Sequence, residues 1–232
     1  MTNSLPSPDS RSRAVISWSS GKDSALALQE VYRSGSFEVV GLLTTVSEAF
    51  HRVSMHGVRE ELLVAQAESL GLPLHVVRIP SPCPNAVYEE RMAAMVHSLQ
   101  LQGVSHIVFG DLFLEDIRHY REAKLAKTGI QPVFPLWGRP TRALAEEMLA
   151  MGIQCVLVCV DPRVLGKEFA GRWFSRELLE ELPASVDPCG ERGEFHTFVA
   201  GSPLFRAPIA VDVGPVVERD GFVFADLTRR SG

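Results

Sequence analysis

Residues 19–24 read Ser-Ser-Gly-Lys-Asp-Ser and follow an apolar run that we expect to form a strand at 14–18. A helical pattern begins directly after them, at Ala25. Small residues behind a buried strand leave backbone N–H groups free to face an anion, and the N-terminus of the next helix adds positive charge. This order of strand, small-residue loop and helix predicts a phosphate-binding loop at the first strand of an α/β fold.

The loop is not a Walker A motif, whose pattern is G-x-x-x-x-G-K-[ST]. Counted back from Lys22, the first glycine would stand at Ile16, and Asp23 occupies the place of the Ser or Thr. The loop is instead similar to the S-G-G-x-D-S signature of PP-loop ATP pyrophosphatases, which cleave ATP between the α and β phosphates. Ser20 replaces the second glycine and reduces the backbone freedom at that position. The alternative is a Ser/Gly turn that merely precedes a helix.

The composition limits the classes of protein to which the chain can belong. The 232 residues are 46% apolar and carry a net charge of −5, without the basic excess typical of nucleic-acid or membrane-surface binding. Four cysteines include no C-x-x-C pair, so we predict free thiols in a reducing cytoplasm and neither a zinc nor a redox motif. We expect residues 1–12 to form a disordered arm without a secretory signal, and no stretch approaches the roughly 18 apolar residues of a membrane span. These features predict a cytoplasmic protein with a small-molecule site and no membrane or nucleic-acid partner.

Beyond the loop, apolar runs alternate with amphipathic segments, which is typical of a parallel sheet covered by helices. The pattern predicts strands at 14–18, 37–46, 74–79 and 105–109. It predicts helices at 22–33, 57–70, 85–102 and 114–127.

A change in composition marks a second region. Proline and glycine become frequent after Gly129, and this predicts a domain junction there. We therefore expect an ATP-binding domain at 13–129 and a substrate-binding domain at 130–232. In the second domain the pattern predicts helices at 141–151 and 176–181, a strand at 155–160, further strands after Phe195, and a terminal hairpin from the strands 210–217 and 222–227.

Three residues outside the loop are candidates for the nucleotide site. Gly110 and Asp111 follow the expected strand 105–109, at the edge of the sheet where ligands bind in open α/β folds. Asp111 would hold Mg²⁺ or face the nucleotide, or it would only cap a turn. His56 is expected to open the helix 57–70, where a structural role is the alternative.

The segment 187–199 gathers three carboxylates, a thiol and an imidazole beside aromatic residues. Its carboxylates would coordinate Mg²⁺ or position an amine, and Thr197 offers a hydroxyl. The alternative is an acidic, solvated turn beside a strand. Cys189 has no partner cysteine nearby, so we do not expect it to be a nucleophile.

Together, the 19–24 loop, Gly110-Asp111 and the sequence Gly-Glu-Arg-Gly-Glu-Phe-His-Thr-Phe-Val at 190–199 resemble the diphthine–ammonia ligase family of PP-loop ATPases. The resemblance covers residues 13–205, and the pattern G-E-x-G-E-F-x-T-F-V is specific to this family. It implies a Rossmann-like parallel sheet of the adenine nucleotide alpha hydrolase (HUP) type, followed by a smaller C-terminal α+β domain. It also implies that ATP activates a carboxylate as an acyl-adenylate, releasing pyrophosphate, and that ammonia displaces AMP to give an amide.

The resemblance implies roles for individual residues. For nucleotide binding it implies Ser17, Ser19, Ser20, Gly21, Lys22, Asp23, Ser24, His56, Gly110 and Asp111. For the acceptor and ammonia side it implies Glu191, Glu194, His196 and Thr197. Catalysis would fall to Lys22, Asp23, Glu191 and Glu194, and Mg²⁺ to Asp23 and Asp111.

Two positions depart from the family pattern: Ser20, and His196, where members often have another Glu. Residues 134–138 and 187–190 are similar to the bacterial branch of the family. Because bacteria lack diphthamide, we expect an acceptor carboxylate other than that of elongation factor 2, on a small molecule or a protein side chain. The competing hypotheses are a tRNA-modifying PP-loop enzyme and a non-catalytic adenine-nucleotide sensor. A homodimer is expected only by analogy with the fold.

Overall fold

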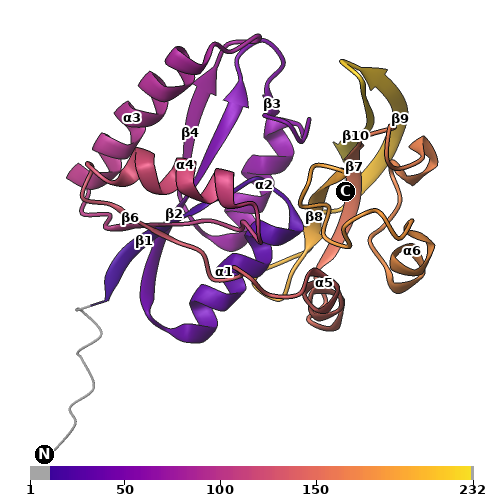
Figure 1. Ribbon diagram of the computed structural model, residues 1–232, viewed down its shortest axis with the longest axis horizontal. Coiled ribbons are helices and arrows are strands. Elements are labelled where there is room, and N and C mark those ends of the chain that lie inside the picture. Colours follow the sequence, from indigo (N-terminus) through magenta and orange to yellow (C-terminus); the bar gives the residue numbers. More distant parts are fainter. Residues whose placement is uncertain (1–10, 231–232) are drawn as a thin grey trace, which may run out of the picture.

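The computed structural model describes residues 11–230. Figure 1 shows two β-sheets, one in the indigo-to-magenta part of the chain and one in the orange-to-yellow part. The predicted disordered arm at 1–12 lies outside the described residues except for its last two positions. Of these, Ser12 already belongs to the first strand.

Six strands form the first sheet: β1 (Ser12–Ser17), β2 (Phe37–Ser47), β3 (Arg52–Val53), β4 (Leu74–Ile79), β5 (His106–Val108) and β6 (Gln131–Val133). Their order is β3-β2-β1-β5-β6, and β4 also pairs with β2. Every pair is parallel except β2 with β3. The predicted Rossmann-like parallel sheet is confirmed.

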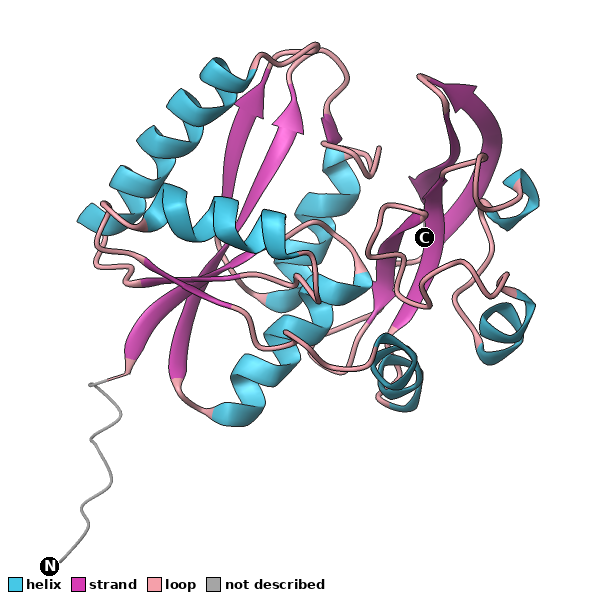
Figure 2. Cartoon of the chain, viewed as in Figure 1, coloured by secondary structure: helices cyan, strands magenta, loops and turns pink. Residues whose placement is uncertain are grey.

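Four helices cover the two faces of this sheet, as Figure 2 shows: α1 (Lys22–Ser34), α2 (Glu60–Leu70), α3 (Asn85–Leu101) and α4 (Glu115–Leu125). Successive side chains of a strand point to opposite faces. Accordingly, Ile16 of β1 packs in one core cluster with Leu26 of α1, and Val15 packs in another with Leu99 of α3. Burial on both faces explains why this strand is wholly apolar at its centre. Across residues 11–230, no helix combines the length and the apolar character that crossing a bilayer requires.

The second sheet is antiparallel, in the order β8-β7-β10-β9. Its strands are β7 (Gln154–Val160), β8 (Phe195–Gly201), β9 (Val211–Arg219) and β10 (Phe222–Arg229), and α5 (Thr141–Ala150), α6 (Arg176–Glu181) and a 3₁₀ turn at Lys167–Phe169 accompany it. The predicted terminal hairpin is β9–β10. Its two turn residues, Asp220 and Gly221, have positive φ angles of 53° and 79°, as tight hairpin turns require.

Three details differ from the sequence-based expectation. β6 lies within the proline-rich stretch where we predicted the domain junction, and Pro132 is tolerated because β6 is an edge strand. The two-residue strand β3 was not predicted. The helix expected at 57–70 begins only at Glu60, because Met55 and Gly57 take left-handed conformations with φ of 65° and 69°. The division at 129/130 stays a prediction.

The two sheets are joined at the phosphate-binding loop. The carbonyl of Ser20 accepts hydrogen bonds from Val199 N of β8 (2.9 Å) and from Gln66 Nε2 of α2 (3.1 Å). Gln66 Nε2 also donates to Val199 O (2.7 Å), and Gln66 Oε1 accepts from Trp18 Nε1 (2.8 Å). Because Gln66 is fully buried and satisfied on both sides of its amide, it fixes the loop between the sheets.

Candidate active site

A cavity of about 760 Å³ opens at the junction of the two sheets. One wall comes from the phosphate-binding loop and the carboxyl ends of β1, β2 and β5, and the opposite wall comes from residues 190–197. Of the predicted nucleotide-binding residues, the lining includes Ser17, Ser19, Lys22, Asp23, Ser24, His56, Gly110 and Asp111. The structure therefore brings most of the predicted residues from distant parts of the chain to one cavity.

Ser20 takes the conformation that the family pattern assigns to glycine. Its φ is 70°, in the left-handed region. This region is energetically unfavourable for a residue that has a side chain. It is fully buried, its Oγ has no hydrogen-bond partner among the described residues, and neither Ser20 nor Gly21 lines the cavity. A Cβ on Gly21 would lie 3.2 Å from His56 Cε1 and 3.2 Å from Thr197 O. The loop is thus packed tightly between α2 and β8.

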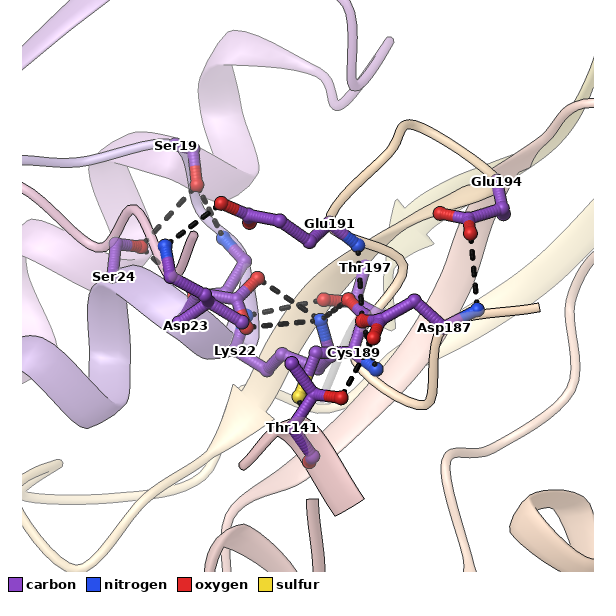
Figure 3. A network of polar contacts seen from close by, with 12 residues as sticks. Ser19, Lys22, Asp23, Ser24, Thr141, Asp187, Cys189, Glu191, Glu194 and Thr197 are labelled. Atoms are coloured by element: carbon purple, nitrogen blue, oxygen red, sulfur yellow. Dashed lines mark hydrogen bonds and ion pairs between the residues drawn. The ribbon is translucent and has the colours of Figure 1, made fainter. Parts of the chain in front are cut away.

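Lys22 connects the loop to the segment 187–197. Its backbone N–H donates to Thr197 Oγ1 (3.1 Å), and its Nζ donates to Asp23 Oδ2 (2.9 Å) and to the carbonyl of Cys189. The ammonium also lies 5.2 Å from the centre of the Phe195 ring. Burial by itself lowers the pKa of Lys22, but the Asp23 carboxylate outweighs it and holds that pKa above its ordinary value. Lys22 is a permanent positive charge at the cavity wall, and Figure 3 shows it beside Asp23.

The two predicted metal ligands are each paired with a cation. Asp23 binds Lys22, and Asp111 Oδ2 lies 2.7 Å from Arg121 Nε. Burial raises the pKa of Asp23 even though Lys22 opposes that shift. Between residues 11 and 230, no three His, Cys, Asp or Glu side chains converge as a metal site would require. Gly110 is packed against the loop, since a Cβ there would lie 2.9 Å from the backbone carbon of Asp23.

Glu191 reaches across the cavity toward the first sheet. Its Oε1 accepts from Leu112 N (2.7 Å) and Phe113 N (3.3 Å), in the loop after β5. Burial raises the pKa of Glu191 to about 7; these backbone bonds oppose the shift, and the nearby charges of Asp23 and Asp111 add to it. A carboxyl group with this pKa changes charge near neutral pH, as a general base requires.

Glu194 does not reach the cavity, contrary to the catalytic and substrate-binding roles that the resemblance implied for it. Its Oε1 accepts from Asp187 N (3.0 Å) and its Oε2 from Arg192 N (2.9 Å), so both oxygens are used inside the loop. Figure 3 shows it on the side of the loop away from Lys22 and Glu191. Glu194 is a brace that shapes the loop.

The cysteine of the same loop is also structural. Cys189 is buried, its Sγ lies 3.3 Å from Thr141 O, and its N–H donates to Asp187 Oδ1 (2.9 Å). Burial raises the pKa of Cys189 far above the ordinary value of a thiol. A thiol held protonated in this way is a poor nucleophile.

The tilted rings of two histidines lie against each other at the cavity wall. The ring centres of His56 and His196 are 4.4 Å apart with an interplanar angle of 33°. We expect His56 from the sequence to open the helix at 57–70, but in the structure it lies in the turn before α2. Its Nδ1 is 3.3 Å from the carbonyl of Thr197. Burial, with Lys22 nearby, lowers the pKa of His196 to about 4, and burial with His196 and Lys22 lowers that of His56 as well. Both imidazoles are neutral.

The structure also assigns functional positions that the sequence interpretation missed. Gln66 makes the contact between the two sheets. The sequence pattern that could have identified it is a polar side chain on the apolar face of a predicted helix. The cavity also extends beneath α3 and α4, where its lining includes Tyr88, Met92, Ile117, Tyr120 and Arg121. Helical periodicity indicated that these helices cover a sheet, but it carried no signal for a hollow under them.

Comparison with known proteins gives consistent matches along the chain. Residues 12–132 match the family model described as diphthamide synthase N-terminal domain, and residues 140–226 match the one described as diphthamide synthase C-terminal domain. A diphthine–ammonia ligase of Danio rerio is 27% identical over 239 residues, covering 93% of this chain and 92% of that protein. The diphthine–ammonia ligase of Homo sapiens is 28% identical over 234 residues, covering 90% of this chain and 86% of that protein. A solved structure described as a predicted subunit of tRNA methyltransferase from Methanocaldococcus jannaschii aligns with a TM-score of 0.45 and 17% identity, covering 82% of this chain and 98% of that chain.

Proposed function

Because the chain belongs to the diphthamide synthase family, we propose that it is an ATP-dependent carbon–nitrogen ligase that adenylates a carboxylate and then transfers ammonia to it. Relatives along nearly its whole length are named diphthine–ammonia ligases, which supports the ligase class and ammonia as the nitrogen donor. The acceptor given in the names of these relatives is diphthine. For this chain the acceptor is proposed only as a carboxylate.

One observation carries the proposal. A single cavity joins the phosphate-binding loop, which ends at Ser24, to Thr197 of β8 and to Glu191 in the loop before β8. The carboxylate must react beside the α-phosphate, and ammonia must then react at the same place. The two walls must therefore face the same space. A nucleotide sensor would need only the first wall.

In the first step, an oxygen of the substrate carboxylate attacks the α-phosphorus of ATP, and the bond to the bridging oxygen of pyrophosphate breaks. The Lys22 ammonium and the N–H groups of Asp23 and Ser24, in the first turn of α1, lie where they can neutralise the charge that develops on the phosphates. Lys22 is already held in place by Asp23 and by the Cys189 carbonyl. This fixed position means that little reorganisation is needed when ATP binds.

In the second step, ammonia attacks the acyl carbon, and AMP leaves with the electron pair of the acyl–oxygen bond. The attacking nitrogen must then lose a proton. Glu191 lines the same cavity and has a pKa of about 7, so its ionised form can accept that proton near neutral pH. Hydrogen bonds from Leu112 N and Phe113 N hold one carboxylate oxygen and leave the other available.

Mg²⁺ remains a prediction, and the protein donor set does not fit a site built by the chain alone. Asp23 and Asp111 are both paired with cations, and the described residues provide no third ligand beside them. Mg²⁺ commonly binds phosphate oxygens together with one or two carboxylates. An ion would therefore arrive with ATP, and we assign no step to it.

The proposal is tested by the products of ATP cleavage. The chain is incubated with ATP labelled at the α-phosphate, an ammonium salt and a panel of carboxylates; the nucleotides are separated, and released pyrophosphate and phosphate are measured by coupled assays. We expect AMP and pyrophosphate in equal amounts, only when an acceptor is present. With hydroxylamine in place of ammonia, an acyl-adenylate would be trapped as a hydroxamate.

The competing functions give different results in the same experiment. ADP and phosphate as the sole products would overturn the proposed reaction. Tight ATP binding without turnover across the panel would favour a sensor. Carboxylate-independent AMP formation that requires tRNA, together with a shift of tRNA in a low-salt gel, would favour a tRNA-modifying enzyme.

A further inference from the structure

The paired histidines have chemistry that nucleotide binding does not use. His56 and His196 both line the cavity, with their ring centres 4.4 Å apart. Neutral imidazoles are weak partners for phosphate, which normally selects Lys, Arg or backbone N–H groups. Their place beside the loop therefore calls for a different ligand.

The hydrogen bonds define which nitrogen atoms are available. A backbone carbonyl can only accept, so the contact of His56 Nδ1 with Thr197 O places the proton on Nδ1 and leaves a lone pair on Nε2. Within residues 11–230, His56 Nε2 and both ring nitrogens of His196 have no hydrogen-bond partner. The pair thus offers two lone-pair acceptors and one N–H donor to the cavity.

The charge around the pair selects a neutral guest. Lys22 is the charged group that acts on both rings, and its ammonium is fixed by Asp23 and the Cys189 carbonyl. Burial, which lowers the pKa of both imidazoles, disfavours a cation such as ammonium beside them, and the Lys22 ammonium adds a repulsion that its pairing with Asp23 reduces. On the loop side the His56 ring is closely packed, because a Cβ on Gly21 would lie 3.2 Å from His56 Cε1.

We propose that His56 and His196 form the binding site for neutral ammonia, the nitrogen donor of the ligase reaction. The inference rests on the proposed function and deepens it. Ammonia donates N–H to the lone-pair nitrogens of the two rings and keeps its own lone pair free. That lone pair forms the C–N bond while the acyl–oxygen bond breaks, AMP leaves, and one proton passes from nitrogen to the Glu191 carboxylate.

Histidine-selective ¹⁵N NMR on the full chain tests this site without turnover. Seven histidines give the signals, and the variants His56→Gln and His196→Phe assign the two that matter. Ammonium chloride is added at constant ionic strength against potassium chloride. We expect the Nε2 resonances of His56 and His196 to move, while that of His106, in the strand β5, stays fixed. At about pH 6.5 the same response should need about a hundredfold more total ammonium than at about pH 8.5, because the free ammonia fraction falls about tenfold per unit.

His196→Phe keeps a ring against His56 but has no nitrogen lone pair, so we expect the His56 signal to lose most of its ammonia response with an unchanged melting temperature. If this variant does not fold, His196→Leu, which also lacks an acceptor, serves the same purpose. Three results would overturn the site: no shift in excess ammonia, equal shifts at both pH values for equal total ammonium, or shifts produced only by ATP or pyrophosphate. A chain that forms AMP and pyrophosphate without any ammonia response remains a ligase and loses this site. An ammonia response without AMP formation would overturn the ligase proposal alone.

Discussion

The two walls of the cavity are built on different principles. The phosphate site in the wall of the first sheet is mainly backbone: a short loop, the start of α1 and glycine at 110, where a Cβ would lie 2.9 Å from the backbone of Asp23. The wall of the second sheet is made of side chains, and neighbouring ones point to opposite sides, Glu191 into the cavity and Glu194 into the loop. A site made of backbone groups can be predicted from the order of strand, loop and helix in the sequence. A site made of side chains depends on which way each side chain points.

The largest effect is expected where the two walls meet, at Lys22. Lys22→Met removes the fixed charge beside the phosphates, so AMP formation should fall by at least about 10³-fold. It also leaves the half-buried Asp23 without its partner, which should cost about 1–3 kcal/mol of folding free energy. AMP release and thermal unfolding measure the two effects, with the exposed Lys127→Met as control.

The double variant Lys22→Met/Asp23→Asn separates the two effects. It removes both members of the buried ion pair, so stability should recover while AMP formation stays low. Recovery of activity together with stability would mean that Lys22 acts on the loop structure and not on the phosphates.

Glu191→Gln tests the side-chain wall. The amide oxygen can still accept from Leu112 N, so the melting temperature should stay close to that of the wild type. Loss of the proton acceptor should lower the rate of amide formation by about 10²-fold. An unchanged rate would place the base elsewhere.

The same variant should change the pH dependence. The pKa of Glu191 is raised to about 7, so the ionised, proton-accepting form becomes populated as pH rises through neutrality. At constant free ammonia, the wild-type rate should increase between about pH 6 and pH 8, and the rate of Glu191→Gln should not. Steady-state rates across this range provide the measurement. The same linkage means that a protonated Glu191 stabilises the fold at low pH, and that this contribution is lost as pH rises through about 7.

Glu194→Gln should have the opposite effect to Glu191→Gln: it should lower the stability of the fold more than the rate of the reaction. A Gln side chain can accept only one of the two N–H groups, from Asp187 and Arg192, and its NH₂ group would face the other. We expect a loss of about 2 kcal/mol and a melting temperature lower by roughly 4–8 °C. At temperatures well below melting the rate should remain close to wild type. A rate loss equal to that of Glu191→Gln, with an unchanged melting temperature, would show that the brace opens during catalysis.

These differences define how far the sequence could predict the molecule. The parallel sheet followed from the order of apolar runs, because each strand is buried by neighbours in the chain. The loop 19–24 followed from the same order. The divergent directions of Glu191 and Glu194 could not be predicted, since the hydrogen bonds that decide them come from Leu112, in the first sheet, and from the fold of their own loop. The turn before α2 was missed because Gly57, which the pattern placed in the helix, and Met55, which is not a glycine, both adopt positive φ.

The smallest expected effect lies in the backbone wall, at Ser20. Its left-handed conformation costs about 1–2 kcal/mol for a residue with a Cβ, and its buried hydroxyl has no partner among the described residues. Ser20→Gly removes both costs but adds unfolded-chain entropy of about 0.4–1 kcal/mol. A net gain of about 1 kcal/mol and a melting temperature higher by about 2–4 °C should follow. Ser19→Gly is the matched control and should be destabilising, because Ser19 Oγ accepts from Gly21 N (3.3 Å) and contacts Ser24 Oγ (3.3 Å). A destabilised Ser20→Gly would mean that the hydroxyl has a partner, and the backbone wall would then depend on a side chain as the other wall does.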